Sequence, residues 1–291
     1  NISMTMAQHS LGLNGLLGEY SSKKNIQGML ISHGSHVFHK DPIAAVEWEH
    51  HSKNLIYGAF SKTAIQTPLT QRFTRNYSNK STHYCNTGPL LFNRNNILDK
   101  KEHFKKKFFN LDPHVKLITH IGTPKPFETF RPWIYETIDE YIVNINQISE
   151  FLEQKTDILF AIRFRENKWL SADEFSSRIR KSNNTIIVGN NISLYNNLKS
   201  SDLMISYSST VIEEALELQI PVATFDSQCK YDHLKYAHKG LNSSIYVHLY
   251  KISDLDFLLS NLAVEASSFD ALKKDFEIDC DIRHIASNNL T

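Results

Sequence analysis

Along the second half of the chain, short apolar runs alternate with stretches in which apolar residues recur every three or four positions. The apolar runs lie at residues 115–119, 157–162, 185–188, 202–206 and 220–225. Runs of this length predict β-strands, and the periodic stretches between them predict helices. Strands that alternate with helices are typical of a parallel sheet built from βαβ units.

The longest predicted helix begins at Arg131 or Thr137 and ends near Gln154, because isoleucine, tyrosine and leucine recur there at helical spacings. Ser171 is expected to cap a second helix, with Glu174 completing a capping box. Shorter helices are predicted at residues 193–199, 209–218 and 253–264.

The first half is patterned less clearly. Strands are predicted at residues 27–32, 54–57 and 83–86, which are too few for a complete Rossmann-like domain. A turn-like stretch at Asp112-Pro113 favours a boundary there, with domains at 1–110 and 111–291. The expected fold class is therefore α/β with two Rossmann-like domains. The first domain is expected to be abbreviated or truncated, and the missing initiator methionine favours truncation.

Composition narrows the class of protein. Hydrophobic residues make up 41% and charged residues 22%, which is ordinary for a soluble globular protein. No apolar run approaches the roughly 20 residues that span a bilayer, and the first residues do not resemble a signal peptide. The three cysteines are scattered, which favours a reducing compartment, so a cytoplasmic location is predicted. The histidines match no metal-binding spacing, and no metal site is predicted.

The two halves differ in charge. Residues 1–110 hold 14 lysines and arginines against 6 acidic residues, a net charge of +8, and residues 111–291 hold 18 against 25, a net of −7. Such asymmetry points to different partners for the two halves. The basic half would suit an anionic acceptor or a membrane surface, and a solvated basic face is an equal alternative.

A run of hydroxyl residues follows the predicted strand at 202–206. Ser206, Ser208, Ser209 and Thr210 lead directly into a helix, where backbone N–H groups and the helix dipole favour a phosphate. Glu213, one turn further on, would accept hydrogen bonds from ribose hydroxyls. The alternative is structural, because such runs also serve as helix caps.

This stretch resembles the donor-binding core of GT-B glycosyltransferases. The resemblance rests on the strand, the Tyr207-Ser208-Ser209 turn, the helix with Glu213, and the following Ile220-Pro221-Val222, over about residues 115–235. The CDP-glycerol glycerophosphotransferases of teichoic-acid synthesis are similar there, and Phe225-Asp226 with Tyr231 echoes their pattern. They carry aspartate where this chain has Ser206, which favours a sugar over glycerol phosphate. The resemblance implies a nucleotide-activated donor and no cofactor.

Three cations after the strand at 157–162 are further donor-binding candidates. Arg163, Arg165 and Lys168 follow its carboxyl end, where ligands of open α/β sheets collect. Arginine suits bidentate contact with phosphate. The alternative is a surface ion pair with Glu166 or Asp173.

Acid–base candidates lie at three places. His33 ends the strand at 27–32 beside Gly34, and the teichoic-acid transferases similarly carry a His-Gly pair, which marks His33 as the candidate base. Glu47 belongs to a segment that equally fits an exposed helix with a buried Trp48. His120 ends the strand at 115–119 and is expected to face the interdomain cleft. The glycine-containing loop at 122–126 follows, as a ligand loop or as scaffold.

The segment from Lys100 to Phe109 mixes cations with aromatic residues. Such a segment would suit peripheral contact with an anionic membrane, where each basic residue contributes about 1 kcal/mol. The alternative is a solvated helix with its phenylalanines in the core. No recognised nucleic-acid motif is present.

These features predict a glycosyltransferase that moves a sugar from a nucleotide-sugar donor to a surface glycan or a lipid-linked acceptor. Its active site is expected in the interdomain cleft, at the cytoplasmic face of the membrane. Three alternatives remain: a CDP-glycerol-type glycerophosphotransferase, a sugar-nucleotide 2-epimerase, and a non-catalytic sugar-nucleotide-binding subunit. No metal is required, since arginines and a helix N-terminus can neutralise the phosphate charge.

Overall fold

The computed structural model describes residues 2–31, 41–66, 70, 74, 82–87, 100–126, 133–228, 246–260 and 262. The described residues fall into two compact units, the first within residues 2–87 and the second within residues 100–262, and each unit is described by itself. Both units are α/β, which confirms the predicted fold class.

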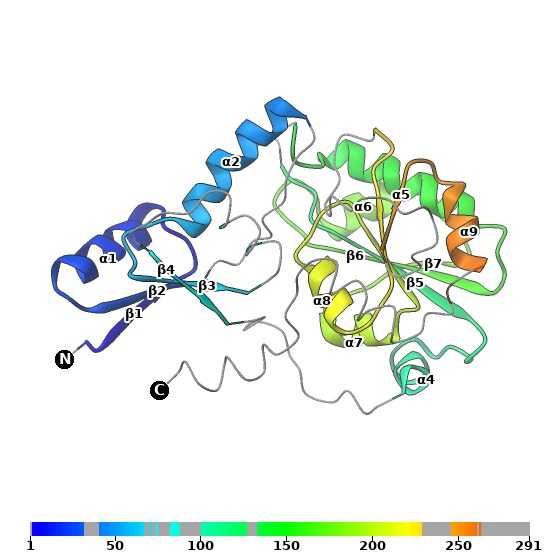
Figure 1. The fold of residues 1–291 in the computed structure, drawn as a ribbon. Helices are drawn as coiled ribbons and strands as arrows, with labels where there is room; N and C mark the ends of the chain where they lie inside the picture. The colour runs from blue at the N-terminus through cyan, green and yellow to red at the C-terminus, as the bar shows by residue number, and fades with distance from the viewer. Residues whose placement is uncertain are drawn as a thin grey trace. The chain divides into compact units, whose positions relative to one another are not determined.

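The first unit contains a four-stranded parallel sheet (Figure 1). The strands stand in the order β1-β2-β3-β4. Its elements, in chain order, are β1 (Met4–Ala7), α1 (Gly12–Lys23), β2 (Gln27–Ile31), α2 (Pro42–Ile56), β3 (Lys62–Ile65) and β4 (His83–Asn86).

One strand prediction for this unit is wrong, and two strands were missed. Residues 54–56 form the last turn of α2, where the apolar side chains of Leu55 and Ile56 are buried. A short apolar run of this kind cannot be told from a strand by periodicity. The missed strands, β1 and β3, each have only four residues.

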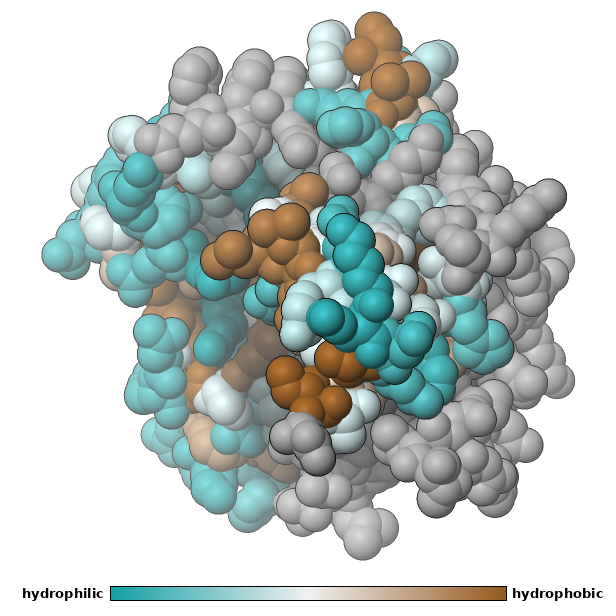
Figure 2. Space-filling view, turned by 90° about the vertical axis from the view of Figure 1, so that its left-hand side faces the viewer, coloured by the Kyte–Doolittle hydropathy of each residue, from teal (hydrophilic) through white to brown (hydrophobic). Residues whose placement is uncertain are grey.

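The amino-terminal elements of this unit carry exposed hydrophobic side chains. Figure 2 shows hydrophobic residues among hydrophilic ones on the face that it presents. Exposed side chains of β1 and α1 include Met4, Met6, Leu13, Leu16 and Tyr20.

The second unit contains a six-stranded parallel sheet, in the order β10-β9-β8-β5-β6-β7 (Figure 1). Its strands are β5 (Lys116–Gly122), β6 (Ile158–Phe164), β7 (Thr185–Ile187), β8 (Leu203–Ser206), β9 (Val222–Phe225) and β10 (Tyr246–Leu249). Its helices are α4 (Lys101–Phe104) with the π-helix η1 (Lys105–Phe109), α5 (Ile138–Leu152), α6 (Ala172–Arg178), α7 (Leu194–Ser200), α8 (Val211–Glu217) and α9 (Asp254–Ser260). The five strands predicted for this half are confirmed, and β10 was not predicted.

Hydroxyl caps fix where several helices begin. Of the two predicted starts of α5, Thr137 is correct: it accepts a hydrogen bond from the Glu140 amide, and the Glu140 carboxylate accepts one from the Thr137 amide. Ser171 accepts a hydrogen bond from the Glu174 amide at 3.2 Å and so caps α6 as predicted, but the Glu174 carboxylate lies near Arg178 and does not complete the predicted capping box.

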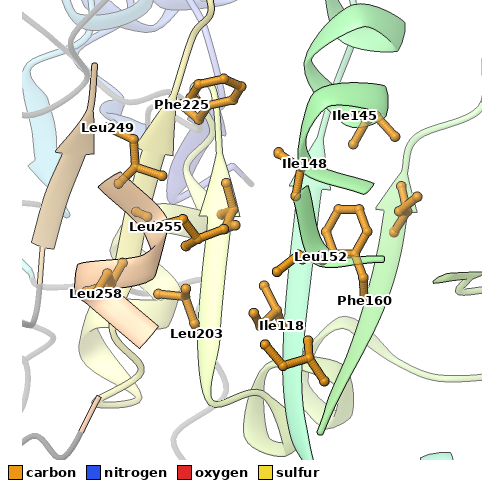
Figure 3. Packing of buried hydrophobic residues seen from close by; sticks show 14 of the residues in the cluster. Ile118, Ile145, Ile148, Leu152, Phe160, Leu203, Phe225, Leu249, Leu255 and Leu258 are labelled. Atoms are coloured by element: carbon orange, nitrogen blue, oxygen red, sulfur yellow. The ribbon is translucent and has the colours of Figure 1, made fainter. Parts of the chain in front are cut away.

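Helices cover both faces of the six-stranded sheet. The larger core lies between the sheet and helices α5, α6 and α9 (Figure 3). There Ile118, Phe160 and Leu203 from neighbouring strands pack with Ile148 of α5 and Leu258 of α9. Helices α7 and α8 and the α4–η1 segment lie on the opposite face (Figure 1). The sheet is therefore buried on both faces, as its apolar strands require.

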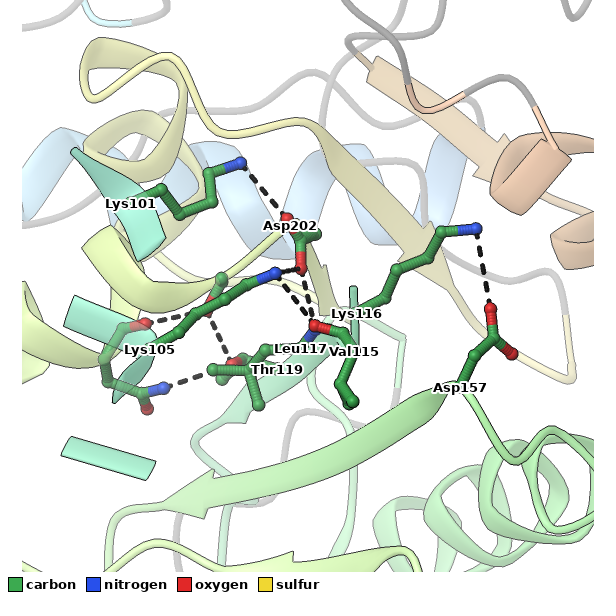
Figure 4. A network of polar contacts seen from close by, with 10 residues as sticks. Lys101, Lys105, Val115, Lys116, Leu117, Thr119, Asp157 and Asp202 are labelled. Atoms are coloured by element: carbon green, nitrogen blue, oxygen red, sulfur yellow. Dashed lines mark hydrogen bonds and ion pairs between the residues drawn. The ribbon is translucent and has the colours of Figure 1, made fainter. Parts of the chain in front are cut away.

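The α4–η1 segment is fixed to the second unit by a network around Asp202 (Figure 4). Lys105, only 4% exposed, places its ammonium group 2.5 Å from the Asp202 carboxylate and donates to the Val115 carbonyl. Lys101 lies 3.4 Å from the same carboxylate, which also accepts a hydrogen bond from the Leu117 amide. Residues 101–109 thus pack with the second unit, although the sequence-based boundary placed them in the first domain.

This packing bears on the predicted membrane contact of Lys100 to Phe109. Phe104 is buried and lies 6.4 Å, between ring centroids, from Tyr195 of α7. Lys106 and Lys107 remain exposed. Lys101, Lys105 and Phe104 therefore attach this segment to the second unit. This agrees with the alternative interpretation of the sequence, in which the segment is a helix with phenylalanine in the core. None of the helices in the described ranges has the length and apolarity to cross a bilayer.

Candidate functional site

The order in which the chain adds strands to the six-stranded sheet reverses between β5 and β8. From β5 the chain builds outward to β6 and β7, then returns to place β8 on the other side of β5. Ligands of open α/β sheets bind in the crevice at the carboxyl ends of such a pair of strands. The Ser206–Thr210 turn follows β8 and the 122–126 loop follows β5, so the structure brings both predicted segments to this switch point.

Ser206 holds this end of the sheet together. Its side chain is fully buried and donates a 2.7 Å hydrogen bond to the Ile121 carbonyl of β5. The bond ties the last residue of β8 to the neighbouring strand. Ser206 therefore supports the candidate site from within the sheet.

The next three hydroxyl residues reach the surface. Ser208, Ser209 and Thr210 are half-buried, and α8 begins at Val211. The Ser209 hydroxyl accepts a hydrogen bond from the Val211 amide at 3.3 Å, which stabilises the turn that leads into α8. As a hydroxyl it still has its own proton to donate. Glu213 lies nearly buried in the first turn of α8.

Glu214 is a titratable group that sequence reasoning missed. Burial raises its pKa to about 7, which places its charge change near neutral pH. Perturbed carboxyl groups of this kind collect at functional sites. No sequence signal distinguishes it from its neighbour Glu213.

Arg163 and Arg165 have different environments at the end of β6. Arg163 is half-buried and donates a 2.6 Å hydrogen bond to the Ile192 carbonyl, which anchors the loop before α7, and burial lowers its pKa. Arg165 is exposed, and its backbone amide donates to the Gly122 carbonyl. Neither of the predicted ion pairs, with Glu166 or Asp173, is formed by these arginines in the described chain.

Lys125 is a further cation beside the switch point. Burial, and then the charge of nearby Arg165, lowers the pKa of its ammonium group. Its nitrogen lies 5.3 Å from the centre of the Tyr135 ring. Within the described ranges, neither Lys125 nor Arg165 forms an ion pair with a carboxylate. The sequence predicted this loop as a possible ligand loop because it contains Gly122, but no sequence signal identified Lys125 as a cation without a carboxylate partner.

A buried polar chain connects the loops that flank the switch point. The Glu136 carbonyl accepts from the Lys125 amide, and its carboxylate accepts a 2.7 Å hydrogen bond from the Asn144 amide group. The Asn144 side-chain oxygen in turn accepts from the Ser227 amide, just after β9. The positions of the β5 and β9 loops are thus coupled through α5.

The three acid–base candidates have different outcomes. His33 lies outside the described residues. Glu47 is half-buried on α2 in the first unit, one residue before the buried Trp48. His120 is only 1% exposed and packs against Tyr141 of α5, 5.4 Å between ring centroids, so in this structure it faces the core and not a cleft.

Lys168 is exposed, with its ammonium group 4.9 Å from the centre of the Trp169 ring. Among the described residues, no group of three or more histidine, cysteine, aspartate or glutamate side chains could hold a metal ion.

No protein-family model matches the sequence, and no curated protein matches it significantly. Solved structures do resemble the chain. A variant of the wall teichoic acid polymerase TagF matches with a TM-score of 0.59 at 17% identity, over 98% of this chain and 71% of that one. TarM matches with a TM-score of 0.51 at 16% identity, over 92% and 50%. The complex of Staphylococcus aureus MnaA with UDP matches with a TM-score of 0.53 at 12% identity, over 98% and 68%.

At these identities the likeness establishes the fold. The two parallel α/β units have the GT-B fold, as the sequence predicted.

Proposed function

We propose that the chain is a glycosyltransferase that binds a nucleotide-activated sugar at the β5–β8 switch point and transfers the sugar to a glycan or lipid-linked acceptor. The observation that carries this proposal is the placement of half-exposed Ser208, Ser209 and Thr210 on one side of the switch point and Lys125 on the other. Hydroxyl donors and a cation without a carboxylate partner suit a diphosphate. The UDP in the MnaA complex, a structure of the same fold, also supports a nucleotide donor.

In the proposed reaction, the bond between the sugar carbon and the donor phosphate breaks as an acceptor hydroxyl forms the new glycosidic bond. The nucleotide leaves with added negative charge, which Lys125 would neutralise and the hydroxyl groups would stabilise by donating hydrogen bonds. Arg163 would hold the Ile192 loop in place, and Glu213 would bind ribose. His33, or failing it Glu47, would take the proton of the acceptor hydroxyl.

Titration of the purified chain with UDP-, CDP-, CMP-, GDP- and ADP-sugars tests the donor. We expect one family of nucleotides to bind with the others at least tenfold weaker, as measured by calorimetry. Binding of none of them would contradict the proposal. Loss of transfer in His33→Ala with donor affinity retained would separate an enzyme from a binding subunit.

A second candidate is a glycerophosphotransferase that takes CDP-glycerol. The structural likeness to TagF, one of whose matching structures was soaked with CDPG, favours including it. The same titration separates the two: CDP-glycerol would bind and be consumed, while the sugar nucleotides would not. Peripheral membrane contact and a cytoplasmic location remain predictions, and Lys100, Lys106 and Lys107 are exposed lysines of the segment that could make such contact.

Lys125→Glu is expected to weaken nucleoside diphosphate binding about 100-fold, because the change reverses a charge next to the phosphates. Folding should be little affected, since Lys125 forms no ion pair in the described chain. Lys181→Glu is the matched control. Lys181 is an exposed lysine in the loop between α6 and β7, which precedes β7 and so lies at the amino ends of the parallel strands, away from the switch point. Equal affinities of the two variants would show that the phosphates bind elsewhere.

A further inference from the structure

One polar side chain interrupts the buried face of helix α5. Asn144 is 1% exposed and lies on the same helix as the fully buried Tyr141 and Ile145. A buried amide is unfavourable unless its ends form hydrogen bonds. The Asn144 amide group donates a 2.7 Å hydrogen bond to the Glu136 carboxylate, and the Asn144 oxygen accepts one of 3.1 Å from the Ser227 amide. Asn144 therefore joins two segments that are distant in the sequence.

These two segments lie on either side of the Ser208–Thr210 turn. The turn follows β8, and β8 lies between β9 and β5 in the sheet. The Glu136 carbonyl accepts a hydrogen bond from the Lys125 amide in the loop after β5, and Ser227 is the second residue after β9. The hydrogen-bonded chain from Glu136 through Asn144 to Ser227 thus spans the strand that carries the hydroxyl residues.

The end of β5 packs against the same helix. A β-carbon at Gly122 would collide with the ring of Tyr141, so this glycine permits the close approach of the strand to α5. Burial, and then the charge of Glu136, raises the pKa of the Tyr141 hydroxyl, which places the Glu136 carboxylate near this ring. Gly122 and Lys125 are therefore both positioned by α5 and the residues that lead into it.

We propose that Glu136 and Asn144 are positioning residues of the donor site. They hold the loops after β5 and β9 at a fixed separation, so that Lys125 and the Ser208–Thr210 turn face the same diphosphate group. Both side chains are buried and act through the loops, without touching the ligand. This role rests on the proposed function, because the ligand is the nucleoside diphosphate part of the donor.

A diphosphate site depends on such support because several groups bind the ligand at once. Each hydrogen bond to the phosphates weakens steeply when its angle or length is lost. A productive site is held within about 0.5 Å by supporting residues whose own rotamers are fixed by packing and hydrogen bonds. Asn144 meets this description, since it is buried and hydrogen-bonded at both ends.

Calorimetric titration of the parent and its variants with UDP, CDP, GDP and ADP tests this role. Asn144→Leu removes both hydrogen bonds at similar volume, and it should weaken the nucleotide that the parent binds best about tenfold. The double variant Glu136→Gln with Asn144→Asp exchanges the two groups. The introduced amide then donates to the introduced carboxylate, which also accepts from the Ser227 amide. This variant should bind within about threefold of the parent.

Asn146→Leu is the matched control on the same helix. The Asn146 side chain is also hydrogen-bonded at both ends, donating to the Arg178 carbonyl and accepting from the Arg180 amide, but both partners precede β7 and lie away from the switch point. Nucleotide affinity should therefore not change. Urea denaturation of each variant measures stability separately. If Asn144→Leu binds nucleotide as the parent does, or the double variant binds as weakly as Asn144→Leu, the positioning role is overturned.

Amide hydrogen exchange tests the connection between the loops without a nucleotide. In the described part of the chain Asn144 forms no hydrogen bond with Lys125. Asn144→Leu should nevertheless speed exchange of the Lys125 amide about tenfold, because Glu136 loses its hydrogen bond to Asn144, whereas Asn146→Leu should not. Unchanged exchange of Lys125 overturns the connection. If exchange responds but none of the nucleotides binds the parent, the proposed donor site fails and the connection stands.

Discussion

Asp202→Asn is expected to lower the free energy of unfolding of the second unit by about 3 kcal/mol, the cost of breaking a buried ion pair from one side. The substitution leaves the Lys105 ammonium group, 4% exposed, opposite a neutral amide (Figure 4). The amide oxygen can still accept the hydrogen bond from the Leu117 amide, which is why the loss is not larger. Urea denaturation followed by far-UV circular dichroism measures it.

Two further variants make the result specific to the buried pair. Lys155→Met removes an ion pair with Asp256 whose nitrogen–oxygen distance, 2.6 Å, is as short, but whose side chains are more exposed. Pairs of that kind contribute at most about 1 kcal/mol. Adding Lys105→Met to Asp202→Asn removes the stranded cation and should recover part of the loss. If Asp202→Asn lowers the free energy of unfolding no more than Lys155→Met does, the network does not stabilise the second unit as proposed.

Five of the six strands of the second unit could be predicted from the sequence, because their apolar runs are bounded by clear signals. The runs at 157–162 and 202–206 are apolar and continuous, and Thr137 and Ser171 are hydroxyl caps with glutamate three residues later. The first unit lacks such signals. The missed strands β1 and β3, Met4-Thr5-Met6-Ala7 and Lys62-Thr63-Ala64-Ile65, are not continuous apolar runs. Leu55 and Ile56 at the end of α2 resemble a strand in sequence.

The candidate site was predictable as a place but not as a set of contacts. The order of strands and helices located the switch point, and the run from Ser206 to Thr210 drew attention to it. Which hydroxyl faces the surface depends on the pairing of β8 with β5, which buries Ser206 against Ile121. The availability of Lys125 depends on which carboxylates lie nearby, and that follows only from the packing of distant segments.

The titration of His120 is the second large effect. Burial lowers the pKa of its imidazole from 6.5 to about 3, so the folded chain holds it neutral while the unfolded chain takes up a proton below pH 6.5. Its contribution to stability is complete above pH 6.5 and is lost as the pH falls from 6.5 toward 3. Each pH unit in that window is equivalent to about 1.4 kcal/mol. At pH 4.5, protonation of His120 in the unfolded chain should therefore lower the free energy of unfolding by about 3 kcal/mol.

His120→Leu isolates this contribution, because leucine fills a similar volume and does not titrate. Carboxyl groups also titrate in this window, but they do so equally in both proteins. The variant should therefore gain about 3 kcal/mol relative to the parent between pH 7 and pH 4.5, measured by urea denaturation at both values. Tyr141→Phe removes the hydroxyl of the neighbouring ring and keeps the histidine, so its offset from the parent should be the same at both pH values. If the parent and His120→Leu instead lose stability in parallel, His120 reaches solvent and exchanges protons, and it becomes an acid–base candidate again.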